Sequence, residues 1–126
     1  MTDDFAEAGL RLFKDGDHLF NEGRYGTATH LFGLSAECAL KACMQNFLSA
    51  SRTLPRCHLP ELADHARLWF KGRRRNAIGL LLKKADYMAG WIIDNRYWPN
   101  SAFSRDQCVL CRDHSRRTLY AVKRNL

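Results

Sequence analysis

The sequence has 126 residues, 46% of them hydrophobic, which suits a single domain over residues 1–126 with one apolar core. No stretch approaches the roughly 20 apolar residues of a membrane-spanning helix, and the acidic opening MTDD is wrong for a secretory signal. We therefore expect a cytoplasmic protein that does not enter membranes. The net charge of +7 favours anionic partners, such as nucleic acid, nucleotide phosphates or an acidic protein surface.

The first two predicted elements are long helices, because apolar residues recur with a helical period and strand-like alternation is nearly absent. Residues 3–22 place Phe5, Leu12 and Leu19 on one face, with His18 pointing away, and Gly23 occupies the position that ends a helix. Residues 25–49 are apolar almost all round, which predicts the central helix of a bundle. Residues 49–60 are expected to form a loop.

Three further helices are predicted after this loop. Residues 60–70 begin with Pro60 at a first-turn position, and residues 73–95 carry an apolar stripe from Ile78 to Ile92. Ser104 is the expected N-cap of a last helix that runs to near the C-terminus. Short connections between long amphipathic helices predict an all-α, up-and-down bundle of four to five helices, with antiparallel neighbours.

The central stretch THLFGLSAECALKACM mixes apolar residues with two cysteines, a glutamate and a lysine. Cys38 and Cys43 lie about 140° apart on a helix, so they cannot share a metal ion or form a local disulfide. We expect them to be small buried side chains. Glu37 and Lys41 have the i, i+4 spacing and order of a stabilising ion pair, which explains both without any chemistry.

The stretch CVLCRDH resembles half of a zinc site through Cys108, Cys111 and His114. A structural zinc site needs four ligands, and the adjacent pair Cys57 and His58 rarely converges on one ion. On a helix both cysteines fall on the core stripe and His114 falls off it. With an odd number of cysteines and no framework spacing, we expect reduced thiols, no metal site and no cofactor.

Four basic side chains share one face of the predicted last helix, within about 40° of each other: Arg105, Arg112, Arg116 and Lys123. Only Asp106 and Asp113 lie near enough along the helix to offset them. Two interpretations stay open. The row is a solvated face, or it is a line of phosphate contacts or a surface for an acidic partner.

Two other basic stretches are candidates for binding. Arg73, Arg74 and Arg75 begin the predicted fourth helix, where the helix dipole opposes cations, so a purely stabilising role is disfavoured although solvated charge also explains them. Arg96 and Tyr97 stand at a helix exit beside a tryptophan. That combination suits base stacking or phosphate binding, and equally a loop whose rings pack against the end of the bundle.

Taken together, three features resemble the HEPN superfamily (higher eukaryotes and prokaryotes nucleotide-binding domain) over about residues 5–122. They are the central helix with Glu37 and Lys41, the loop histidine of CHLPEL, and Trp91 followed by Arg96 and Tyr97 before the last helix. The resemblance implies a helical bundle that forms homodimers. It also implies association with RNA, nucleotides or a minimal nucleotidyltransferase, often within toxin–antitoxin pairs.

One branch of that superfamily consists of metal-independent RNases, whose arginine and histidine are spaced R-x4-6-H near the start of the last helix. The spacing occurs three times here, against the roughly 1.7 matches that chance gives, which is no signal. It never occurs at that place, where eight residues separate Arg105 from His114. We therefore expect no catalytic residues of this type. If the chain is an RNase, Arg24 and His30 at the start of the central helix are the candidate pair.

Three hypotheses follow. The first is a non-catalytic HEPN-type bundle, dimeric, that binds RNA, nucleotide or a nucleotidyltransferase partner. The second is an RNase with a displaced arginine–histidine pair, in which His30 must be accessible to act as an acid or a base. The third is a bundle that only mediates protein assembly.

Overall fold

The computed structural model describes residues 1–71 and 77–125, except for the side chains of residues 123–125. Within these residues the chain is helical and has no strand. The five α-helices are α1 (Phe5–Asn21), α2 (Tyr25–Met44), α3 (Glu61–Trp69), α4 (Ala77–Leu82) and α5 (Arg105–Asn125). Three short 3-10 turns complete them: η1 (Gln45–Phe47), η2 (Ile93–Tyr97) and η3 (Asn100–Ala102). The predicted all-α bundle is confirmed.

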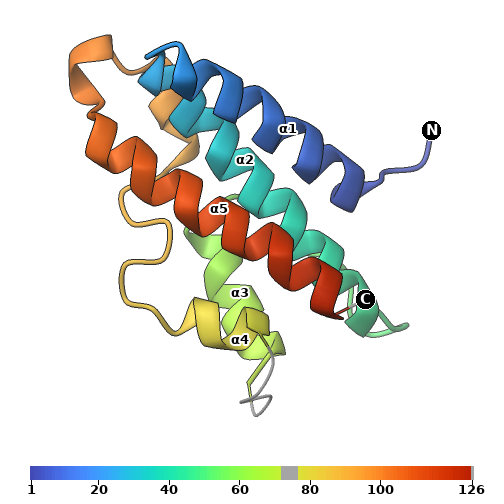
Figure 1. Cartoon of the computed structure of the whole chain (residues 1–126). Helices are drawn as coiled ribbons and strands as arrows, with labels where there is room; N and C mark the ends of the chain where they lie inside the picture. The colour runs from blue at the N-terminus through green and yellow to red at the C-terminus, as the bar shows by residue number, and fades with distance from the viewer. Residues whose placement is uncertain (72–76, 126) are drawn as a thin grey trace.

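Three long helices, α1, α2 and α5, lie side by side, and α3 and α4 lie below them in Figure 1. α1 runs antiparallel to α2, to which a short connection joins it, as expected, and it is also antiparallel to α5 (Figure 1). α2 and α5 instead run in the same direction, because residues 83–104 carry the chain back to the end where α2 begins (Figure 1). Phe103, just before α5, accordingly packs on Gly26 in the first turn of α2, where an added Cβ would lie 3.0 Å from the ring.

α2 is the centre of the bundle, as its all-round apolar sequence predicted. Its buried apolar side chains are Ala28, Phe32, Ala36, Ala39, Leu40, Ala42, Cys43 and Met44. α1 approaches closely at Gly9, whose carbonyl accepts a 2.6 Å hydrogen bond from the Ser35 hydroxyl. Neither α2 nor another helix of the described residues is long and apolar enough to cross a membrane.

The structure confirms the predicted end of α1 and the predicted start of α5, but not the predicted end of α2. Asp4 caps α1 by accepting from the Glu7 N–H at 2.9 Å, and Gly23 has the positive φ of 77° that ends this helix. Ser104 caps α5 by accepting from the Gln107 N–H at 3.1 Å, as predicted. α2, however, ends at Met44 and gives way to the 3-10 turn η1, so the prediction of a helix to residue 49 is wrong.

The long helix predicted over residues 73–95 is wrong: α4 ends at Leu82, and residues 83–92 are irregular. Tyr87, Met88 and Trp91 of this segment are buried all the same, in tertiary contacts that a straight helix would not allow, whereas Ala85 and Ala89 are exposed. Tyr87 shares a 2.8 Å hydrogen bond with Thr118, and Trp91 donates from Nε1 to the Thr29 carbonyl at 3.0 Å. The Trp91 ring occupies the space where a Cβ on Gly33 would stand. Packing has overridden the local helical pattern.

Candidate functional site

Two adjoining pockets open at the start of α2, and together we call them the α2 pocket. They share Gly26, Thr27, Asn100 and Phe103. One, of about 300 Å³, is completed by Gly23, Arg24 and Tyr25. The other, of about 220 Å³, is completed by His30, Asn95, Arg96 and Trp98. The first turns of α2 therefore form one wall, and η2, η3 and the residues before α5 form the other.

Local sequence explains why this end of the bundle is hollow. Gly26 has no side chain, which lets the Phe103 ring lie against the backbone of α2. Trp98 packs on Phe103 with ring centroids 6.2 Å apart. The two 3-10 turns bring these aromatic rings and the polar residues between them to the first turns of α2. The result is a wall of aromatic rings, backbone and amide side chains.

The electrostatics of the α2 pocket favour an anion. Arg24 is the N-cap residue of α2, but it provides no side-chain cap, and the first turn contains no acidic residue. Uncapped N–H groups and the helix dipole make such a helix start attractive to phosphate. Arg96 adds a guanidinium group to the opposite wall.

His30 is held neutral in this pocket. Burial lowers the pKa of its imidazole below the usual 6.5, and the nearby Arg96 guanidinium and His58 imidazole lower it further. The ring stacks on Trp91 at a centroid distance of 6.2 Å. A neutral imidazole can accept as well as donate a hydrogen bond, which is the state that a general base or a base-reading group requires.

Two polar atoms of this pocket's lining residues have no hydrogen-bond partner. They are His30 Nδ1 and the side-chain oxygen of Asn95, and both are buried. Asn95 is only 3% exposed, although its neighbours Tyr97 and Trp98 are 74% and 42% exposed. Leaving a buried polar atom unpaired costs about 1–3 kcal/mol, so a ligand that supplied donors here would recover part of that cost.

The sequence-predicted pair Arg96 and Tyr97 belongs to this region. The Arg96 guanidinium lies over the Tyr97 ring, 4.7 Å from its centroid, and Arg96 lines the pocket. Sequence reasoning missed Asn95, Asn100 and Phe103. The aromatic spacing of Trp98 and Phe103 around a proline was the one signal available, whereas nothing marked Asn95.

Arg24 and His30, the candidate RNase pair, line the two halves of the α2 pocket. Arg24 is exposed, and His30 is partly buried. The pair therefore shares one surface, which sequence spacing alone did not establish. Whether it performs chemistry stays a prediction.

The predicted basic row of the last helix does not form one free surface. Arg105 and Arg112 both lie over the Phe20 ring, at 5.4 and 4.8 Å from its centroid. Arg112 also donates from Nε to Asp17 at 2.6 Å. The prediction that only Asp106 and Asp113 would offset the row is therefore wrong, because it ignored the facing helix α1.

The remaining basic candidates divide into two groups. Arg116 is exposed and lines a groove of about 410 Å³ between α4 and α5 with Leu80 and Tyr120. The Lys123 side chain, and Arg73, Arg74 and Arg75, lie outside the described residues. Their predicted roles stay predictions.

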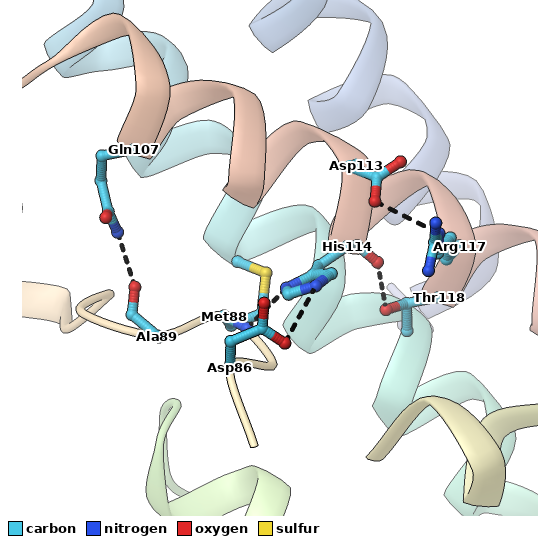
Figure 2. A network of polar contacts seen from close by, with 8 residues as sticks. All are labelled: Asp86, Met88, Ala89, Gln107, Asp113, His114, Arg117 and Thr118. Carbon is cyan, nitrogen blue, oxygen red and sulfur yellow. Dashed lines mark hydrogen bonds and ion pairs between the residues drawn. The ribbon is translucent and has the colours of Figure 1, made fainter. Parts of the chain in front are cut away.

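The prediction that His114 lies off the core stripe is wrong. The side chain is only 1% exposed, and its Nδ1 accepts a 2.9 Å hydrogen bond from the Met88 N–H (Figure 2). Its Nε2 lies 3.8 Å from an Asp86 carboxylate oxygen. Residues 86–89 fold over this side of α5 and bury the ring. The predicted burial of Cys108 and Cys111 is confirmed.

Glu37 also departs from its predicted role. Its carboxylate is buried, lies 3.0 Å from His58 Nδ1 and accepts from the Leu59 N–H at 2.8 Å. Lys41 instead places its ammonium 5.7 Å from the centroid of the Phe5 ring. The pair predicted at i, i+4 is therefore wrong, because the tertiary contact with the loop outcompetes the local one.

Comparison with family models, with curated proteins and with solved structures finds no match. The resemblance to the HEPN superfamily therefore stays a prediction based on the residues quoted above.

Proposed function

We propose that this chain is a HEPN-type bundle that binds single-stranded RNA or its nucleotides at the α2 pocket without cleaving them. One observation carries the proposal. The start of α2, Arg96 and two residues that carry unpartnered buried polar atoms, His30 and Asn95, line a hollow that is flanked by exposed aromatic rings. These are the groups that bind phosphate, read a base edge and stack on a base.

In this proposal each part of the ligand has its own site. A phosphate lies at the uncapped first turn of α2, within reach of the exposed Arg24. A base stacks on Tyr97 or Trp98, which are exposed beside the pocket. An amino group of a base donates to the Asn95 side-chain oxygen, which has no partner in the protein.

Binding of labelled single-stranded RNA, followed by fluorescence anisotropy, tests this function. Replacing Arg96 or Trp98 with alanine is expected to weaken binding by about 5- to 150-fold, the effect of losing about 1–3 kcal/mol of base contact. Arg52→Ala is the matched control, because the Arg52 guanidinium lies 4.9 Å from the Trp69 ring centroid on another surface. An equal loss in the control variant would show that only general positive charge is involved.

Low salt provides the second arm of this experiment, because phosphate contacts are strongest there. If RNA and nucleotides do not bind even at low salt, the proposal fails and the assembly-module hypothesis takes its place. In that case a protein partner, such as a minimal nucleotidyltransferase, becomes the ligand to seek.

A second candidate function is metal-independent RNA cleavage, which Arg24 and His30 favour because they line the same pocket and His30 is held neutral. A neutral imidazole can accept the proton of a ribose 2′-hydroxyl, and the guanidinium can stabilise the phosphate charge. Incubation of the purified chain with RNA, followed by gel analysis, separates the two functions. Cleavage that disappears in both His30→Ala and Arg24→Ala would overturn the non-catalytic proposal.

The proposal includes a homodimer, for which the groove between α4 and α5 is the supporting feature. Leu80 and Tyr120 are exposed at this groove, beside Arg116 and Arg117. Sedimentation analysis of the wild-type chain and of a Leu80→Glu variant tests this part. Loss of a dimer in the variant supports the groove as the interface, and a wild-type monomer at all concentrations would remove the dimer from the proposal.

A further inference from the structure

Three side chains of different chemistry meet beside the start of α3. The Cys57 sulfur, a Glu61 carboxylate oxygen and a His65 ring nitrogen all lie within 4.8 Å of one another. Glu61 and His65 stand one turn apart on α3, with His65 Nε2 4.0 Å from Glu61 Oε1. Cys57 precedes this helix by four residues. The expectation of no metal site rests on Cys108, Cys111 and the adjacent pair Cys57 and His58, and it does not include the four-residue spacing of Cys57, Glu61 and His65.

We propose that Cys57, Glu61 and His65 bind Zn²⁺ and leave its fourth position to water. Zinc takes sulfur at about 2.3 Å and nitrogen or oxygen at about 2.0–2.2 Å, so tetrahedral donors stand about 3.5 Å apart. The cluster must close by about 1 Å to reach that spacing. The Glu61 and His65 side chains are 71% and 43% exposed, so they can rotate without disturbing the core.

The donor set selects the class of metal. A thiolate and an imidazole suit Zn²⁺, whereas Mg²⁺ and Ca²⁺ require oxygen ligands. Three protein ligands with one open position are the arrangement of zinc sites that hold a water molecule. Partial burial, and next the Glu61 carboxylate, raise the pKa of the Cys57 thiol, so zinc binding has to release its proton.

Bound zinc would fasten the segment before α3 to the helix itself. The next residue, His58, lies 3.0 Å from the Glu37 carboxylate of α2, and Leu59 donates its N–H to the same group. The ion would thus hold Cys57 in place next to His58 and Leu59, which contact Glu37 of α2. Because the site depends on the folded arrangement, Zn²⁺ is expected to raise the melting temperature.

The chain offers a matched control on another helix. His18 and Glu22 of α1 are also spaced i, i+4, with His18 Nε2 3.9 Å from Glu22 Oε1, and both are exposed. No cysteine belongs to this second pair in the described residues. If zinc binds wherever a histidine faces a glutamate, the two sites will behave alike.

Titration of the full, chelator-treated chain with Co²⁺ and Zn²⁺ under reducing conditions tests the site, with Mg²⁺ as a comparison metal. A thiolate-to-cobalt charge-transfer band is expected for the wild type and not for Cys57→Ser. Cys57→Ser and His65→Gln are expected to weaken Zn²⁺ binding by at least about 100-fold, since even an outer-sphere partner is worth about 10- to 100-fold. His18→Gln and Cys38→Ser should bind as the wild type does.

Three results would overturn the proposal: no saturable zinc binding, unchanged affinity in Cys57→Ser or His65→Gln, or an equal loss in His18→Gln. If a variant fails to fold, iodoacetamide modification of the wild-type chain still tests the site. Zn²⁺ should protect Cys57 from iodoacetamide and leave the half-buried Cys38 as reactive as before. Failure of that protection would also refute the site, and it leaves the α2 pocket proposal untouched.

Discussion

His30 and His114, one in each half of the sequence, both stack on an aromatic ring but differ in their hydrogen-bond partners. His30 stacks on Trp91 and His114 stacks on Tyr87, with centroid distances of 6.2 and 5.5 Å. Burial is the first cause that lowers the pKa of each, so both are neutral near pH 7. They differ in what their ring nitrogens contact.

His114 holds the fold together through its ring. Nδ1 accepts from the Met88 N–H at 2.9 Å, and Nε2 lies 3.8 Å from an Asp86 carboxylate oxygen (Figure 2). His30 Nδ1 has no partner, and it belongs to the lining of a pocket. A buried polar group with its partner in place serves the structure, whereas one without a partner calls for an explanation. At His30, which lines a pocket, the explanation that we propose is a ligand. The comparison therefore separates the structural part of the molecule from its candidate site.

The largest expected effect is on stability, at His114. His114→Leu keeps most of the volume but leaves the buried Met88 N–H without an acceptor, so we expect the free energy of unfolding to fall by about 2–3 kcal/mol. Urea denaturation followed by circular dichroism measures the change. His114→Asn is the control, because its side-chain oxygen can still accept from Met88. A loss in His114→Leu no larger than in the control would contradict the assigned contact.

A smaller effect is expected with pH. The folded pKa of His114 lies below 6.5, and the unfolded chain has the usual value, so unfolded chains bind the proton first. Stability is therefore complete above pH 6.5 and falls as the pH drops from there to the folded pKa. His30 contributes in the same direction. Melting temperatures at pH 7.5 and pH 5.5 should differ less in His114→Asn than in the wild type, and an equal difference would exclude His114 as a source.

The helices were predictable from the sequence where local rules decide them. The Ser104 cap, Gly23 and the all-round apolar pattern of α2 each depend on a few neighbouring residues, and the structure confirms them. The segment after α4 was not predictable in this way. Its course depends on Trp91 packing against Gly33, far away in the sequence, and no local pattern records that contact.

In the candidate site, too, contacts between sequence neighbours were predictable and contacts between distant residues were not. Arg96 and Tyr97 were identified because cation and ring are neighbours in the sequence, and their contact is present. Arg112 was misjudged because its partner, Asp17, comes from another helix. Asn95 was missed altogether, since an unpaired buried oxygen becomes visible only when the whole pocket is assembled.

The smallest expected effect on stability is at His30, where the effect on binding should be large. His30→Leu removes a buried nitrogen that has no partner, which relieves its desolvation cost, but it also gives up the ring stacking on Trp91. We therefore expect the free energy of unfolding to stay the same or to rise by about 1 kcal/mol. RNA affinity, measured by anisotropy on the same preparation, should fall because the pocket loses its neutral imidazole. A destabilisation as large as that of His114→Leu, with RNA affinity retained, would show that His30 is a second structural histidine. The distinction between the two histidines would then be lost, and with it the main support for a ligand at the start of α2.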